Sequence, residues 1–155
     1  MANIQKIREL QGKVMKDIAA GAIIPIMMLG DELGLFKKLY EVGPCTSTTF
    51  AKKTKLDPRY IREWLLALSA SKYISYKKKG EKFYLTDEQY AVLADENGSS
   101  LMIGGFENLV GAVHNYSIIK ENFKSGKGTE WGSLHPCCLS GSARFFKPAY
   151  SIFLI

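Results

Sequence analysis

The sequence is poor in the side chains that form covalent cross-links and metal sites. Its 155 residues include only three cysteines, and two of them, Cys137 and Cys138, are adjacent. An odd count with neighbouring members argues against a disulfide framework, and free thiols indicate a reducing compartment. His135 lies close to the cysteine pair, but the cluster lacks the C-x2-C spacing of structural zinc sites. We therefore expect no metal.

The chain also lacks a long apolar run and a targeting segment. The longest run, Ala22–Leu29, is too short to span a bilayer. The first residues, MANIQKIRELQGKVMKD, mix charges of both signs and contain none of the apolar core that a secretory signal needs. Internal repeats and low-complexity tracts are absent as well. We expect a soluble protein of the cytoplasm or the nucleus, with the cytoplasm favoured, and no membrane partner.

The remaining composition is that of an ordinary globular protein, with 46% hydrophobic and 23% charged residues. This length fits one domain, or one small domain with an appendage, and is too short for a complete two-domain enzyme. The net charge of +6 is uneven, because Lys52–Lys82 holds ten basic and three acidic residues and the rest of the chain sums to −1. This basic segment is either a polyanion-binding patch or a solvated face.

The middle of the chain has the element order of a winged helix-turn-helix. Helical patterns over residues 30–43, 48–55 and 58–71 are separated by Gly43 and by the turn LDP, in which Asp57 caps a helix and Pro58 begins it. The residues expected to face the core in the third of these helices are Ile61, Trp64, Leu65 and Leu68. A β-hairpin then joins YISY to FYL through the charged turn KKKGEK, and a short helix starts near Thr86.

A helix is predicted before this motif, from Ile4 to Leu29. Its end, AAGAIIPIMML, is apolar on all sides and should be buried, with a second subunit as one possible cover. Pro25 is expected to kink or break it. If this helix pairs two chains, a charge at Ile23 or Met27 should abolish association.

The last third is less regular. Residues 99–123 have helical spacing, residues 124–142 read as a loop, and residues 142–155 read as a final helix interrupted by Pro148. That helix ends in a strongly apolar stretch that includes Leu154 and Ile155. Because exposed apolar ends are rare, we expect a partner or a missing domain to cover it.

Catalytic and phosphate-binding motifs are not recognisable. SGKGTEWG lacks the spacing of a phosphate-binding loop, and IGGFENLVG lies within a helical pattern rather than after a strand. No carboxylate pair has a spacing that demands acid–base work. His114 lies on a mostly apolar helix and is expected to be buried or to line a pocket. We assign no catalytic residue, no cofactor-binding residue and no metal ligand.

A winged helix can bind DNA through its second motif helix and its basic wing. Arg59, Arg62 and the wing lysines 77, 78, 79 and 82 would supply the charge. The outward face of that helix, however, would carry Leu66 and Tyr73, which suit base edges poorly. The pattern therefore favours a winged helix that contacts protein and disfavours nucleic acid.

Residues 29–76, with YIREWL and KYISY, followed by YAVLADE and by HPCC and ARFFKP, resemble a known family. They are similar to the N-terminal winged-helix head of class I S-adenosylmethionine-dependent methyltransferases, over roughly Met15 to Ile155. The resemblance implies a head that dimerises and roofs a substrate pocket, while a following Rossmann-like domain holds S-adenosylmethionine. No residue here matches that cofactor loop, so the chain alone is expected to be inactive: a fragment, a truncated product or a domain reused for binding.

We thus predict a mainly α fold, a winged helix-turn-helix with a small β-hairpin wing and appended N- and C-terminal helices. Its parts are a dimerisation helix (1–29), the winged helix (30–95) and a helical cap and linker (96–155). The expected partner is a second copy or a related methyltransferase, and a small-molecule substrate requires a catalytic domain. The alternatives are a DNA-binding regulator and a regulatory subunit in mixed dimers. Candidate pocket residues are Phe106, Asn108, His114, Tyr116 and Trp131.

Overall fold

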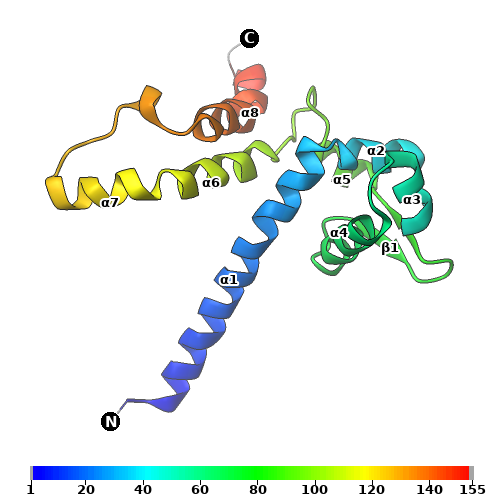
Figure 1. The fold of residues 1–155 in the computed structure, drawn as a ribbon, viewed down its shortest axis with the longest axis horizontal. Helices are drawn as coiled ribbons and strands as arrows, with labels where there is room; N and C mark the ends of the chain where they lie inside the picture. The colour runs from blue at the N-terminus through cyan, green and yellow to red at the C-terminus, as the bar shows by residue number, and fades with distance from the viewer. Residues whose placement is uncertain (1, 154–155) are drawn as a thin grey trace.

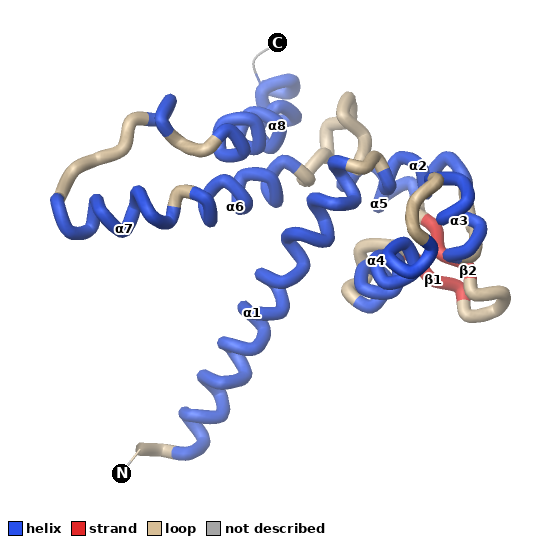
Figure 2. The backbone as a smooth tube through the Cα atoms, viewed as in Figure 1, coloured by secondary structure: helices blue, strands red, loops and turns tan. Residues whose placement is uncertain are grey.

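The computed structural model describes residues 2–153 and is mainly helical, with one two-stranded antiparallel sheet (Figure 1 and Figure 2). Met1, Leu154 and Ile155 lie outside the described residues, and the last two belong to the apolar end that the sequence assigns to the final helix. In chain order the elements are α1 Ile4–Glu32, α2 Leu35–Val42, α3 Ser47–Thr54, α4 Pro58–Ala70, β1 Ser75–Lys77, β2 Lys82–Tyr84, α5 Asp87–Leu93, α6 Gly104–His114, α7 Tyr116–Ser125, a 3₁₀ turn Trp131–Ser133 and α8 Pro136–Phe153.

Three parts are visible in Figure 1. Helices α2 to α5 and the hairpin form one unit, here called the body. Two arms diverge from it and enclose a V: the first arm is α1, and the second is the end-to-end pair α6 and α7. Helix α8 folds back along α6, on the side of α6 away from α1 in this view.

The body is the winged helix-turn-helix that the sequence predicts, and the mainly α fold class is confirmed. Thr46 caps α3 by accepting a hydrogen bond from the Thr49 backbone, and Asp57 caps α4 with Pro58 at its first position. Gly43 ends α2 with a φ of 70°, a conformation that glycine adopts without strain. The hairpin pairs Tyr76 with Phe83, so its turn forms the wing.

Aromatic side chains dominate the core of the body. The ring centroids of Phe36 and Trp64 lie 5.3 Å apart, and the Phe50 ring stacks on Trp64 at 6.4 Å. All four residues that the sequence places on the core face of α4 are buried, as predicted: Ile61, Trp64, Leu65 and Leu68. The Trp64 indole donates to the Ile26 carbonyl at 2.9 Å, which ties α4 to the end of α1.

Helix α1 differs from its prediction in two ways. It runs through Pro25 without a break as far as Glu32. Proline removes only one backbone hydrogen bond, the one to the carbonyl of Gly21, and Gly21 is an exposed residue. Burial is also narrower than predicted: within the apolar end at residues 19–29, Met27 and Met28 are buried, whereas residues 19–22, Pro25 and Leu29 are exposed, like all of residues 2–18. A charge at Met27 would therefore disrupt the body, and the expectation that it tests association is wrong.

The last third is more helical than its pattern indicates. Helix α8 begins at Pro136, inside the segment predicted as a loop, and passes through Pro148 to Phe153 without interruption. The helix predicted over residues 99–123 is instead two helices, which meet at Asn115. Buried Asn115 accepts a hydrogen bond from the His135 backbone at 3.0 Å and donates one to the Cys138 sulfur at 3.2 Å. These bonds hold the joint between α6 and α7 against the start of α8.

Close contact between α6 and α8 depends on glycine. A Cβ atom at Gly111 would lie 2.4 Å from the Cys138 nitrogen, and one at Gly141 would lie 2.4 Å from the Asn108 nitrogen. Any larger residue would push the two backbones apart. Within the described part of the chain, no single helix is long and apolar enough to cross a bilayer; α1 and α2, bent by 66° where they meet, reach that composition only as a pair.

Candidate functional site

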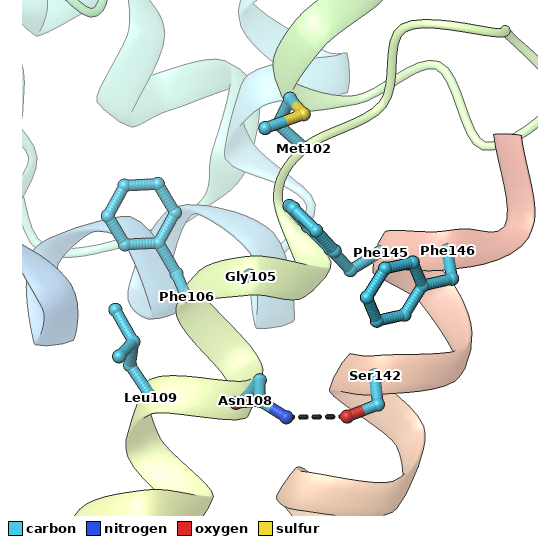
Figure 3. A pocket seen from close by; sticks show the side chains of 8 residues that line it. All are labelled: Met102, Gly105, Phe106, Asn108, Leu109, Ser142, Phe145 and Phe146. Atoms are coloured by element: carbon cyan, nitrogen blue, oxygen red, sulfur yellow. Dashed lines mark hydrogen bonds between the residues drawn. The ribbon is translucent and has the colours of Figure 1, made fainter. Parts of the chain in front are cut away.

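A groove with a volume of about 530 Å³ lies between α6 and α8 (Figure 3). Apolar side chains form nearly all of its wall. Helix α6 and the residues before it contribute Met102, Gly105, Phe106, Asn108 and Leu109, and α8 contributes Ser142, Phe145 and Phe146. An open groove with aromatic walls suits a flat apolar ligand or an apolar side chain.

One polar pair interrupts this lining. The side-chain amide of Asn108 donates to the Ser142 hydroxyl at 2.6 Å and to the Cys138 carbonyl at 3.1 Å (Figure 3). Because both amide hydrogens are used within the protein, the amide oxygen of Asn108 and the hydroxyl hydrogen of Ser142 are the groups left to orient a ligand. The site can therefore accept and donate one hydrogen bond but contains no group suited to proton transfer.

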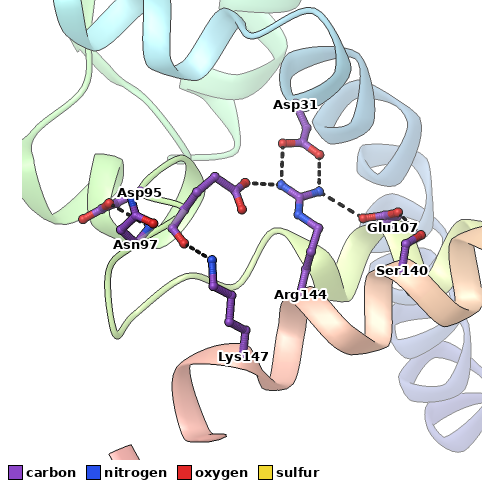
Figure 4. A network of polar contacts seen from close by, with 8 residues as sticks. Asp31, Asp95, Asn97, Glu107, Ser140, Arg144 and Lys147 are labelled. Atoms are coloured by element: carbon purple, nitrogen blue, oxygen red, sulfur yellow. Dashed lines mark hydrogen bonds and ion pairs between the residues drawn. The ribbon is translucent and has the colours of Figure 1, made fainter. Parts of the chain in front are cut away.

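An ion-pair network fixes the position of α8 behind the groove (Figure 4). The Arg144 guanidinium contacts Asp31 at 2.7 and 3.1 Å, Glu107 at 3.0 Å, and also Glu96. The hydrogen bond with Asp31 is the main reason that the pKa of Arg144 is raised. Partial burial acts in the opposite direction, and the hydrogen bonds with Glu96 and Glu107 raise the pKa further. Arg144 thereby joins α1, α6, α8 and the loop after α5 at one point.

The structure brings together two of the five residues proposed from the sequence. Phe106 and Asn108 line the groove, whereas Tyr116 and Trp131 are about two-thirds exposed at the start of α7 and in the 3₁₀ turn. His114 is exposed and does not line the groove, so the expectation that it is buried is wrong. Its ring stacks on that of His135 at 4.2 Å, because the Asn115 joint holds α6 against the start of α8.

Sequence reasoning missed the contribution of α8 to the groove. Ser142, Phe145 and Phe146 line it and belong to the helix predicted over residues 142–155, but no sequence pattern places that helix beside α6. The usable signal is Pro136, which is favoured at the first position of a helix, followed by apolar residues at Cys138, Phe145 and Phe146.

No group of three or more His, Cys, Asp or Glu side chains among residues 2–153 has the geometry to hold a metal ion. Cys137 and Cys138 lie at the start of α8 on different sides of the helix, one half-buried and one buried. Burial raises the pKa of the Cys45 thiol, with a smaller opposing effect of Lys82. At the start of α8 the Cys138 sulfur accepts a hydrogen bond from the Asn115 amide, and the His135 ring accepts one from the Cys137 backbone.

The basic segment is a surface feature of the body. All ten of its lysines and arginines are exposed, and within residues 2–153 ion pairing reaches only Arg62, which meets Glu63 at 3.3 Å. Helix α4 buries one face, and its other face leaves Arg59, Arg62 and Leu66 exposed. Tyr73 is half-buried against the Phe106 ring at 6.1 Å, so it is not part of that outward face.

Comparison with known proteins is consistent with this fold. None of the curated proteins matches the chain, whereas fourteen chains of solved structures do. One of them is the N,N-8-amino-8-demethyl-D-riboflavin dimethyltransferase RosA from Streptomyces davawensis, with a TM-score of 0.58 and 17% sequence identity. The match covers 98% of this chain but only 45% of RosA, its N-terminal portion. The chain therefore has the fold of that portion and spans less than half the length of the enzyme.

A family description also matches the body and the end of α1. Residues 21–95 match the Rv2258c-like winged HTH domain, a range that contains the three helices of the motif, the hairpin and α5. The arms beyond this range, most of α1 and all of α6 to α8, lie outside the family match. Residues 21–95 are accordingly similar to the Rv2258c-like winged HTH domain and fold as a winged helix-turn-helix.

Proposed function

We propose that this chain is the dimerisation and substrate-cap portion of an S-adenosylmethionine-dependent methyltransferase and transfers no methyl group on its own. The observation that carries the proposal is the extent of the likeness to RosA, which includes both arms and α8 and not only residues 21–95. A winged helix alone serves many functions. The groove and the exposed first arm are the features that support this particular function for the chain.

Pairing is supported by the first arm. A helix of 29 residues whose first two-thirds contact little else in the chain would be marginal in water without a partner. Its exposed apolar residues, Ile4, Ile7, Leu10, Val14, Met15 and Ile18, form a large surface of the kind that marks protein contacts. The same surface would let the chain form mixed dimers with a related full-length methyltransferase and tune its activity.

Analytical ultracentrifugation and calorimetry test these two parts of the proposal together. We expect the purified chain to sediment as a dimer of the 17.3 kDa protomer and to bind S-adenosylmethionine more weakly than about 1 mM. Methyl transfer by the purified chain, or micromolar binding of S-adenosylmethionine, would show that the head carries the cofactor site after all.

The substrate-cap role rests on the groove and can be tested with an aromatic probe. RosA is, by its name, a dimethyltransferase of a riboflavin derivative, so riboflavin is a suitable fluorescent probe. We expect weak binding, detected by fluorescence polarisation, that Phe146→Ala reduces several-fold. Phe153→Ala is the matched control, since Phe153 lies on the same helix but is exposed and outside the groove. Equal binding by both variants would remove the groove from the proposal.

The uncompensated charge of the body favours a second candidate, a DNA-binding domain. Its cations are exposed and nearly all unpaired, and α4 leaves one face open. This candidate predicts that duplex DNA binds with an affinity that falls steeply between 50 and 200 mM salt, on the order of 10³-fold if about six phosphates are contacted. Lys77→Glu with Lys79→Glu should abolish binding, whereas Lys120→Glu with Lys127→Glu, on and after α7, should not. No binding at low salt removes this candidate.

A further inference from the structure

The body has a pocket of its own, separate from the groove between α6 and α8. Its volume is about 320 Å³, and it lies where the turn between α1 and α2 meets the end of α3. The residues that line it are Leu33, Gly34, Lys38, Lys53, Thr54 and Leu56. All of them precede α4, whereas the groove is lined only by residues from Met102 onward. The volume is at the lower end of the range of ligand pockets, about 300–1,000 Å³, and therefore suits a small ligand.

Two leucines form the apolar part of the pocket wall. Leu56 follows α3 and is half-buried against the core of the body. Leu33 ends α1 and is 53% exposed. Between α1 and α2, Gly34 has a φ of 64°, and a Cβ atom there would have nothing within 4 Å. The turn therefore places no side chain in front of the leucines, and their apolar surface is open to a ligand.

The hydrogen-bond donors that remain for a ligand are ammonium groups. The Gly34 N–H already donates to the Asp31 carbonyl at 2.9 Å. The Thr54 hydroxyl donates to carbonyls one turn earlier in α3, at 3.0 and 3.2 Å, so its oxygen can only accept a further bond. Lys38 and Lys53 supply the other polar atoms of the pocket side chains. A ligand that needs donors would therefore find them on these two lysines.

The charge of the pocket is positive. None of the six lining residues is acidic, and residues 42–56 contain no Asp or Glu at all. Lys53 has no ion pair within residues 2–153. Lys38 reaches Glu41 at 3.2 Å, but both side chains are more than 40% exposed, and such pairs are weak. Glu32 and Asp57 flank the lining segments in sequence without lining the pocket. An anionic group is therefore the complement of this pocket.

We infer that the pocket binds a small organic carboxylate with an apolar body. The apolar body lies against Leu33 and Leu56, and the carboxylate contacts the ammonium groups of Lys38 and Lys53. A few polar groups beside an apolar wall are the usual means of orienting a small ligand, and the ammonium of lysine binds an anion as a point charge. The inference goes beyond the proposed function, because this ligand is not the substrate of the groove.

Titration of the full chain with naphthoate, followed by two-dimensional amide NMR, tests the inference. We expect saturable shifts of the Gly34 and Thr54 amides with a Kd on the order of 1 mM, as is usual for a ligand of this size. The uncharged naphthamide has nearly the same shape and should bind at least fivefold more weakly, because a charge pair about 4 Å apart in water accounts for roughly that factor.

Matched pairs of variants test the position of the ligand. Lys53→Gln should weaken naphthoate binding about fivefold, whereas Lys52→Gln, at an equally charged neighbour outside the lining, should leave it unchanged. Leu33→Ala should weaken binding about threefold through lost apolar contact. Leu29→Ala, one turn earlier and 51% exposed, should not. All four positions are exposed, so circular dichroism should show a folded protein in every case.

The outcomes separate this pocket from the groove. If Phe146→Ala weakens naphthoate binding and Lys53→Gln does not, the acid occupies the groove, and the inference is overturned while the groove keeps its proposed role. Equal losses in Lys52→Gln and Lys53→Gln would show attraction to the basic segment as a whole, and equal binding of naphthoate and naphthamide would show apolar contact alone; either result overturns the inference. It is also overturned if no saturable shift occurs up to about 10 mM, tenfold above the expected Kd.

Discussion

The guanidinium of Arg144 on α8 forms a two-point ion pair with the carboxylate of Asp31 near the end of α1, at 2.7 and 3.1 Å and across 113 residues of sequence. Both side chains are largely buried, and Glu107 of α6 contacts the same guanidinium at 3.0 Å. The first arm, the second arm and α8 thus meet at one charged centre, which fixes the base of the V and the back of the groove.

Replacing Arg144 should therefore lower the free energy of unfolding by more than the loss of an exposed ion pair does. Arg144→Leu leaves the carboxylates of Asp31 and Glu107 without their cation, and we expect a loss of about 3 kcal/mol in the free energy of unfolding. Arg144→Lys should lose less, because the charge remains but the two-point geometry does not. Urea denaturation measures both. Lys13→Ala, which removes the exposed pair with Asp17, should change stability by less than about 0.5 kcal/mol; an equally small effect of Arg144→Leu would contradict the central role of this network.

A second prediction concerns the contact between α6 and α8. Gly141→Ala places a methyl group 2.4 Å from the Asn108 backbone nitrogen, so the helices must separate, and we expect a loss of about 2 kcal/mol. Gly12→Ala is the matched control in an open part of α1, with nothing within 4 Å of the new methyl group. It should stabilise the protein by up to about 1 kcal/mol through helix propensity. Thermal unfolding of the two variants should shift in opposite directions, and a shift in the same direction would show that the helix contact is loose.

The body was predictable from the sequence because its signals are local. Thr46, Asp57 and Gly43 each act within one turn of the chain, and the hydrophobic period of α4 has no competing interpretation. The breaks expected at Pro25 and Pro148 were wrong for the same reason: a proline ends a helix only where the lost hydrogen bond and the steric strain are not otherwise accommodated. Both helices continue through them.

The groove was predictable only in part, because it depends on contacts between distant segments. Phe106 and Asn108 belong to a recognisable helical pattern, whereas Phe145 and Phe146 reach the groove only because Gly111 and Gly141 let α8 lie close to α6. No local sequence pattern predicts that α6 and α8 lie so close together. For the same reason the stacking of His114 on His135 could not be foreseen from a lone histidine on an apolar helix.

The three thiols should differ in reactivity. Thiolate is the reacting form, and burial both shields Cys45 and raises its pKa. Cys138 is also buried, whereas Cys137 is half-exposed at the start of α8. Brief treatment with iodoacetamide near pH 8, followed by peptide mass spectrometry, should therefore modify Cys137 first. The folded state favours the protonated thiol of Cys45. The stability that this burial provides is complete below the ordinary thiol pKa and is lost as the pH rises through the raised pKa. Preferential labelling of Cys45 would contradict its burial.

Two positions on α1 should separate folding from association. Met27 is fully buried in the core of the body, and Ile18, nine residues earlier on the same helix, is 59% exposed. Met27→Lys would place a charge in an apolar core, at a cost of several kcal/mol, and should abolish the cooperative thermal transition. Ile18→Lys should retain helical circular dichroism and lose only the dimer. If Met27→Lys instead unfolds cooperatively at the wild-type temperature, the end of α1 does not belong to the body, and the V would have no fixed first side.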